Sequence, residues 1–184
     1  MNFTITPLAI PDVLLIKTPV FGDSRGYFSE IFKTSAFPGS GLPGQFAQDN
    51  YSFSRQGVLR GLHFQRSPYA QGKLIRCLKG TIFDVAVDLR KTSPTFGQWV
   101  GHTLDDISGE MLYIPPAFAH GFLVLSPDAL MLYKCTTEYA PGKEGGIRWD
   151  DPQLGIAWPS TSVILSEKDG RLPLLADQHW ESVP

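Results

Sequence analysis

The run Gly57-Val-Leu-Arg-Gly-Leu-His63-Phe-Gln65 decides the fold. It places a histidine two residues before an amide, within an apolar, glycine-interrupted stretch that is typical of a β-strand. A second such stretch lies downstream, where Gly109 is followed after five residues by Pro115-Pro-Ala-Phe-Ala-His120. The sequence therefore predicts two strands that each carry one imidazole.

These two stretches resemble the two signature motifs of the cupins, which fold as jelly-roll barrels. Where the first motif has its second histidine, this chain has Gln65, and where a glutamate is expected it has Tyr69 and Ala70. Zinc and non-haem iron favour three or more convergent nitrogen, sulfur or carboxylate ligands, so two imidazoles alone make a poor metal site. The resemblance implies a cupin barrel without a metal ion.

The composition is that of one globular domain, which we place over residues 1–184. Apolar residues make up 42% of the chain and aromatic residues 12%, enough for a sizeable core. A net charge of −2 without a basic cluster argues against a nucleic-acid surface. No apolar run approaches about 18 residues and the N-terminus shows no signal-peptide pattern, so we expect a cytoplasmic protein that contacts no membrane. Cys77 and Cys135 fit no metal or redox spacing, and we expect buried free thiols.

Short strands and turns are expected along the whole chain. It contains 18 glycines and 15 prolines, and no window of about a dozen residues has clean helical periodicity. The pattern predicts an all-β jelly-roll barrel with a few short helices, near Ser35 and at residues 166–169.

Two hairpins are predicted from the spacing of the apolar runs. Residues 81–89 alternate strictly between two faces, and we expect them to pair with residues 73–78 through the Lys79-Gly80 turn. A second hairpin is expected between residues 121–125 and 130–136, around Ser126-Pro-Asp128.

Strand alternation also predicts which side chains face the barrel interior. If His63 points inward, Gln65 does too, while Arg60 and Leu62 point outward unless a bulge intervenes. The residues in phase with Lys73 are Ile75 and Cys77, and those in phase with Tyr133 are Met131 and Cys135.

Four of these polar residues together predict a site. An unpaired buried polar group costs roughly 1 to 3 kcal/mol, so His63, Lys73, His120 and Tyr133 each need a partner. Taken singly, each also suits a structural role: a satisfied core histidine, a solvated strand lysine or a core aromatic. On one concave face, however, they are a candidate site by default.

From about residue 8 to residue 175 the chain resembles the dTDP-4-dehydrorhamnose 3,5-epimerase family, and the run Leu59–Gln65 is strongly specific for it. The segments that carry the resemblance are residues 21–30, 48–50, 57–65, 71–73, 93–99, 114–121, 133–135 and 149–152. The resemblance implies a cofactor-free and metal-free cupin that inverts C3 and C5 of dTDP-4-keto-6-deoxyglucose, giving the precursor of dTDP-L-rhamnose.

The same resemblance implies roles for individual residues. His63 is expected to be the general base, Asp169 the carboxylate that orients it, and Tyr133 the acid on the opposite face of the sugar. Positions that line the nucleotide-sugar site are matched by Arg25, Glu30, Gln48, Asn50, Arg60, Lys73, His120, Glu144 and Lys168, and the thymine-stacking position by Tyr139. Taken alone, the spacing of Ser166 and Asp169 favours a helix cap.

One departure from the family pattern is visible. The family usually reads Pro-Glu-Gly-Phe-Ala-His, whereas this chain has Ala117 in place of the glycine. A left-handed turn is harder for alanine than for glycine, so that turn is in question, although no catalytic group is touched.

The chemistry expected of these residues agrees with an epimerase. Removing a proton next to a ketone with a histidine base faces a deficit of about a dozen pKa units, about 16 kcal/mol. Lys73, with His120 as a hydrogen-bond donor, places charge at the developing C4 oxyanion. Tyr133 can return a proton from the other side, and arginines such as Arg25 and Arg60 suit a diphosphate.

Other functions remain open on the sequence alone. Within the same family, a 3-epimerase that makes a deoxysugar for an antibiotic or other glycoconjugate shares the scaffold. A metal-dependent cupin oxygenase is disfavoured by Gln65, and a non-catalytic sugar-binding cupin leaves the His63, Lys73 and Tyr133 set without a purpose. We also expect a homodimer, because in this family Arg25 and Glu30 reach the neighbouring subunit's site.

Overall fold

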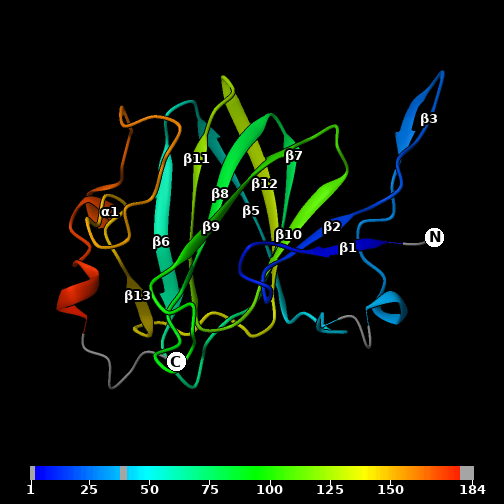
Figure 1. Cartoon of the computed structure of the whole chain (residues 1–184). Coiled ribbons are helices and arrows are strands. Elements are labelled where there is room, and N and C mark those ends of the chain that lie inside the picture. The colour runs from blue at the N-terminus through cyan, green and yellow to red at the C-terminus, as the bar shows by residue number, and fades with distance from the viewer. Residues whose placement is uncertain (1–2, 38–40, 179–184) are drawn as a thin grey trace.

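The computed structural model describes residues 3–37 and 41–178, and two antiparallel sheets that face each other dominate it (Figure 1). In spatial order, the six-stranded sheet consists of β1 (Thr4–Pro7), β2 (Leu14–Lys17), β10 (Glu110–Ile114), β7 (Lys73–Lys79), β12 (Asp128–Cys135) and β5 (Gln48–Arg55). The five-stranded sheet consists of β13 (Glu144–Gly146), β6 (Leu59–Gln65), β11 (Phe118–Val124), β8 (Thr81–Asp88) and β9 (Trp99–Asp105). The predicted all-β jelly-roll architecture is confirmed.

The remaining elements are short. β3 (Phe21–Asp23) and β4 (Gly26–Phe28) form a separate hairpin that projects from the two sheets (Figure 1). The helical turns are η1 (Thr34–Ala36), α1 (Glu167–Gly170) and η2 (Leu175–Asp177). Two of them, η1 and α1, lie at the predicted helical positions. The described part of the chain contains no helix with the length and apolar character needed to span a bilayer.

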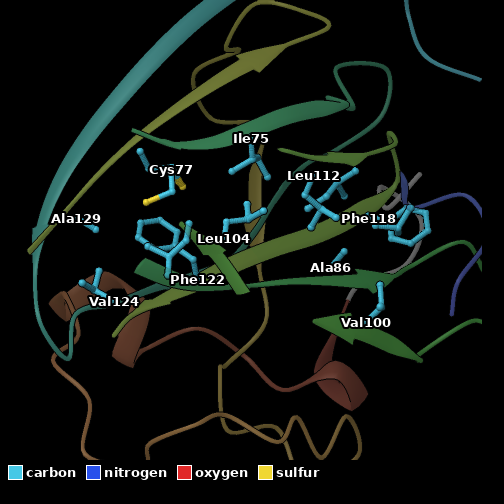
Figure 2. Packing of buried hydrophobic residues seen from close by; sticks show 14 of the residues in the cluster. Ile75, Cys77, Ala86, Val100, Leu104, Leu112, Phe118, Phe122, Val124 and Ala129 are labelled. Atoms are coloured by element: carbon cyan, nitrogen blue, oxygen red, sulfur yellow. The ribbon is translucent and has the colours of Figure 1, made fainter. Parts of the chain in front are cut away.

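The main core fills the space between the two sheets (Figure 2). Ile75 and Leu112 contribute from the six-stranded sheet, and Phe118, Phe122 and Leu104 from the five-stranded sheet. The outer faces are covered as well: Phe37 and Leu42 pack on the six-stranded sheet, and the C-terminal segment packs on the five-stranded sheet through residues such as Leu154 and Leu175. Burial on both faces explains why many strands read as nearly continuous apolar runs. Cys77 and Cys135 are buried free thiols, as predicted.

Both predicted hairpins are wrong. β7 pairs with β10 and β12, whereas β8 pairs with β11 and β9, so the chain crosses from one sheet to the other at the Lys79-Gly80 turn. The chain crosses again between β11 and β12. Alternation identifies the faces of a strand but not its hydrogen-bonded neighbour, and in a jelly roll consecutive strands often belong to opposite sheets.

A β-bulge in β6 alters the predicted side-chain directions. His63 lies opposite His120 while Arg60 lies opposite Phe122, so three steps along β6 match two steps along β11. Gly61 has a φ of +131°, and a Cβ there would lie 2.5 Å from the Gly121 Cα, so the two strands can approach this closely only because glycine lacks a side chain. Arg60 therefore lines the same cavity as His63, whereas regular alternation predicts that it points outward.

The turn before β11 keeps its left-handed conformation despite the alanine. Ala117 has a φ of 71° and is the one non-glycine residue with positive φ among residues 3–37 and 41–178. Its carbonyl oxygen accepts a hydrogen bond from the Leu89 N–H at 3.1 Å, which helps to hold the turn. The alanine therefore does not change the course of the backbone, and its expected effect is to lower the stability of the fold.

Candidate active site

A cavity of about 550 Å³ opens between the two sheets, beside α1. Its walls combine polar groups from both sheets with a few apolar and sulfur-bearing side chains. The lining residues are Gln48, Asn50, Ser52, Arg60, His63, Phe64, Gln65, Gln71, Lys73, His120, Phe122, Met131, Tyr133, Cys135, Tyr139, Glu144, Ser166, Lys168 and Asp169. All of the predicted site residues except Arg25 and Glu30 are among them.

His63 and Asp169 form a hydrogen-bonded pair on one wall of the cavity. The distance from His63 Nε2 to Asp169 Oδ1 is 2.5 Å, although the two residues lie 106 positions apart in the sequence. Asp169 is 4% exposed, whereas the His63 side chain is 42% exposed toward the cavity. Because Nε2 is engaged with the carboxylate, Nδ1 is the nitrogen left to accept a proton.

The short helix α1 explains how the carboxylate reaches this position. Ser166 caps α1, with its Oγ accepting a hydrogen bond from the Asp169 N–H at 3.0 Å. Burial acts to raise the pKa of Asp169, but hydrogen bonds with His63, Ser166 and the Gly61 N–H outweigh it and hold that pKa below its ordinary value. The predicted cap is present, and the carboxylate is free to serve His63 because the serine does the capping.

Lys73 and Tyr133 lie on the opposite wall, in adjacent strands of the six-stranded sheet. Burial lowers the pKa of the Lys73 ammonium, and the charges of Cys135 and Asp84 act in the other direction. Burial raises the pKa of the Tyr133 hydroxyl, so the phenol stays protonated at neutral pH. One wall thus carries an imidazole with one nitrogen free, and the other carries a lysine amino group and a phenolic hydroxyl.

His120 is held by a carboxylate that the sequence did not bring into the site. Its Nε2 lies 2.9 Å from Oδ2 of Asp84, and both side chains are buried. Asp84 lies on β8, on the same face as Ile82 and Ala86, and the alternation of this run did not indicate which face is buried. Once that face is known to be buried, a carboxylate on it needs a partner, and that requirement is the signal by which Asp84 could have been found.

Polar side chains form a connected chain toward one end of the cavity. Gln48 Nε2 donates to Asn50 Oδ1 at 2.8 Å, and Gln48 Oε1 accepts from the Tyr139 N–H at 2.7 Å. The Tyr139 hydroxyl donates to Glu144 Oε1, which also lies 3.4 Å from Lys168 Nζ. The structure therefore brings these five predicted residues together.

Arg25 and Glu30 lie outside the cavity of their own chain. Arg25 is on the exposed β3–β4 hairpin, where Nη2 pairs with Asp23 Oδ2 at 2.6 Å. Glu30 is the second residue after β4, and its Oε1 is buried without a hydrogen-bond partner among the described residues. Within one chain, therefore, neither residue lines the cavity that the other predicted site residues share.

Gln65, the residue at the position of a cupin metal ligand, is engaged with backbone instead. Its Oε1 accepts from the Ala140 N–H at 2.9 Å, and its Nε2 donates to the Tyr69 carbonyl oxygen at 3.3 Å. Among residues 3–37 and 41–178, no three His, Cys, Asp or Glu side chains are grouped to hold a metal ion. The donor set of the cavity therefore does not suit zinc or iron.

Several other lining residues were not identified from the sequence. Ser52 is in phase with Gln48 and Asn50 along β5, and Gln71 precedes Lys73 by two residues. Period-two alternation alone could have found Ser52, whereas Gln71 lies before β7 begins, where alternation gives no direction.

Comparisons with known proteins point to one family. A family model described as dTDP-4-dehydrorhamnose 3,5-epimerase matches residues 7–177. The chain is 53% identical over 169 residues to the dTDP-4-dehydrorhamnose 3,5-epimerase of Salmonella typhimurium. The aligned part covers 91% of this chain and 92% of that relative. The corresponding epimerase of Pseudomonas aeruginosa is 53% identical over 174 residues, or 94% of this chain and 96% of that relative.

A solved structure extends the likeness to three dimensions. The crystal structure of a dTDP-6-deoxy-D-glucose-3,5-epimerase from Legionella pneumophila, in complex with dTDP-4-keto-L-rhamnose, matches with a TM-score of 0.95 and 45% identity. The match covers 100% of this chain and 98% of that one. By sequence and by structure, this chain belongs to the dTDP-4-dehydrorhamnose 3,5-epimerase family.

Proposed function

We propose that this chain is an isomerase that converts dTDP-4-dehydro-6-deoxy-D-glucose to dTDP-4-dehydro-L-rhamnose by epimerisation at C3 and C5, in dTDP-L-rhamnose biosynthesis. One observation carries the proposal. A histidine–carboxylate pair, His63 and Asp169, faces a partly buried phenol, Tyr133, across the cavity. Inversion of a carbon requires a proton acceptor on one side and a proton donor on the other, and this arrangement supplies both.

The reaction proceeds in two proton transfers at each carbon. His63 accepts the proton from the carbon next to the C4 ketone, and the electron pair of the C–H bond moves to give an enolate. Tyr133 then donates its hydroxyl proton to the opposite face of that carbon, and the ketone re-forms with inverted configuration. After each inversion His63 releases its extra proton to solvent and Tyr133 takes a proton from solvent, so both residues are ready for the second carbon and for the next turnover.

The enolate is stabilised by the buried cation and the second histidine. Lys73 places a positive charge inside the cavity, and its lowered pKa reflects the cost of that burial. Asp84 engages Nε2 of His120, so His120 offers an N–H to the same region only through Nδ1 of a ring that carries both protons. Such preorganised groups usually supply the largest catalytic contribution in this kind of chemistry.

The nucleotide end of the substrate is assigned to Arg60 and to the connected polar side chains at one end of the cavity. Tyr139 provides an aromatic face for thymine, and Gln48, Asn50, Glu144 and Lys168 surround it. Arg60 Nε donates to Ser54 Oγ at 3.0 Å, and the arginine lines the cavity near the diphosphate position. No metal ion or organic cofactor is required, because every step is a proton transfer between these side chains and the sugar.

The active form is proposed to be a cytoplasmic homodimer in which the whole chain acts as one domain. The β3–β4 hairpin exposes Phe21, Tyr27 and Phe28, at 51%, 65% and 62%, and it carries Arg25 away from its own cavity. Seating this hairpin on a second copy would bury those aromatic rings and bring Arg25 and Glu30 to the neighbouring site. Light scattering should give a dimer at assay concentration, and a fully active monomer would contradict this arrangement.

Proton NMR of dTDP-4-keto-6-deoxyglucose with enzyme in heavy water tests the function. We expect deuterium to enter at both C3 and C5 and the L-rhamno configuration to accumulate. Inversion confined to C3 would assign the chain to the 3-epimerase branch instead. The absence of exchange at either carbon would exclude an epimerase.

A further inference from the structure

Three glutamine side chains hold the backbone of one short segment, Thr137–Ala140. Gln71 Nε2 donates to the Thr137 carbonyl oxygen at 2.8 Å, and Gln48 Oε1 accepts from the Tyr139 N–H at 2.7 Å. Gln65 Oε1 accepts from the Ala140 N–H at 2.9 Å. Amide side chains therefore replace the strand pairing that β12 gives up when it ends at Cys135.

Gln65 differs from the other two glutamines because it joins two loops. Its Nε2 donates to the Tyr69 carbonyl oxygen, so a single side chain links residues 66–72 to residues 137–140. The side chain is 5% exposed, and both ends of its amide are used. It extends from the same strand as His63, two residues further on, and both line the cavity.

The segment that Gln65 holds carries the aromatic ring assigned to thymine. The Tyr139 backbone N–H is fixed by Gln48, its hydroxyl is fixed by Glu144, and the next backbone N–H is fixed by Gln65. The ring itself is 49% exposed, so packing alone does not restrain it. Its orientation depends on these hydrogen bonds.

We infer that Gln65 is a positioning residue for nucleotide binding, acting through Tyr139. In place of a cupin metal ligand, the amide fixes the Thr137–Ala140 segment so that the Tyr139 ring is already oriented when the nucleotide arrives. Preorganisation of this kind raises affinity because the ordering cost is met before binding. The inference rests on the proposed function, since it takes the ligand to be a thymidine nucleotide.

The test compares dTDP affinity in matched variants by calorimetry. Gln65→Met keeps the length of the side chain and removes both hydrogen bonds, and we expect it to weaken dTDP binding about tenfold. Gln178→Met is the control. Gln178 is 7% exposed and donates to the Gly146 carbonyl oxygen at 2.9 Å, outside the cavity, so its loss should lower stability and leave dTDP affinity unchanged.

A double-variant cycle with Tyr139→Ala separates positioning from general destabilisation. If Gln65 acts through the ring, then Gln65→Met should change affinity less than about twofold once Tyr139 is alanine. Independent, additive losses would overturn the inference. At saturating substrate, kcat of Gln65→Met should stay within about threefold of wild type, because His63 and Asp169 are untouched.

The outcomes also separate this inference from the proposed function. Wild-type protein that neither binds dTDP nor exchanges deuterium would remove both. Wild-type protein that binds dTDP, with Gln65→Met binding equally well, would remove only the role of Gln65. If Gln65→Met does not fold, Gln65→Asn takes its place, since the shorter amide cannot span Ala140 and Tyr69 together.

Discussion

Replacing Asp169 with asparagine separates a catalytic carboxylate from a helix cap. The substitution keeps the size of the side chain and leaves Ser166, the residue that caps α1, in place. It removes the negative charge 2.5 Å from His63 Nε2. An asparagine can also donate its N–H₂ to Nε2, which would place the imidazole proton on Nδ1 and block the nitrogen that accepts the substrate proton.

The size of the effect follows from these contacts. Loss of a correctly held general base typically costs about 10² to 10⁴ in rate. At 1.36 kcal/mol for each factor of ten, that range corresponds to about 3 to 5 kcal/mol of barrier. Stability should fall less, by about 1 to 3 kcal/mol, because Asp169 is 4% exposed and its carboxylate also interacts with the Gly61 N–H and Ser166.

The stability effect should depend on pH in a defined direction. The folded protein holds the pKa of Asp169 below its ordinary value of 3.8. Its contribution to folding is therefore fully present above about pH 4 and is lost as the pH falls through the lowered pKa. Because asparagine does not titrate, the difference in unfolding free energy between wild type and Asp169→Asn should shrink on acidification below about pH 4.

The assay measures two quantities on the same protein samples. Deuterium exchange at C3 and C5, followed by NMR under saturating substrate, reports the base, and urea unfolding reports stability. We expect exchange at both carbons to fall together. A variant that loses about 1 to 3 kcal/mol of stability but exchanges at the wild-type rate would refute the reasoning and return Asp169 to a purely structural role.

Four further predictions follow from the same geometry. Tyr133→Phe should permit exchange without inversion, most strongly at C5, because the base remains while one donor is lost; equal loss of both in one product pool would exclude Tyr133 as the acid. Chelators should leave the rate unchanged, since the amide of Gln65 is engaged with backbone, and a tightly bound metal whose removal abolishes turnover would contradict this. Ala117→Gly should raise the unfolding free energy by about 1 kcal/mol and Tm by about 2 to 4 °C, because Ala117 sits at φ 71°, with unchanged activity as the control. Asp88→Asn should cost about 2 kcal/mol at pH 7, because bonds from Arg90, Ser93 and Thr95 outweigh burial and lower the Asp88 pKa to about 2; the cost should fade as the pH drops from about 4 toward 2, as acid titration of unfolding would reveal.

The sequence predicted the strands and most of the cavity but not the strand pairing. Alternation correctly placed Lys73 and Tyr133 on the interior face, because side-chain direction in a regular strand depends only on local geometry. The partner of a strand depends on contacts between distant segments. The sequence of the Lys79-Gly80 turn is therefore compatible both with a hairpin and with a crossing between the two sheets.

The pairing of His63 with Asp169 could be predicted only through the family resemblance. The two residues lie 106 positions apart in the sequence, and the local sequence around Asp169 indicates a helix cap. Asp84 was missed for a different reason. Alternation did not show which face of its strand is buried, and its hydrogen-bond partner, His120, lies on another strand.

The bulge in β6 makes one glycine essential to the shape of the cavity wall. Between Arg60 and His63 one extra residue shifts the phase of the strand by half a period, so two side chains of odd spacing reach the same wall. Deleting the extra residue would restore regular alternation and leave the two side chains on one face. Substituting Gly61 is different, because any side chain there would place its Cβ 2.5 Å from the Gly121 Cα and force β6 and β11 apart where both strands line the cavity. A residue with no reactive group is therefore as constrained by the bulge as the histidine two positions further on.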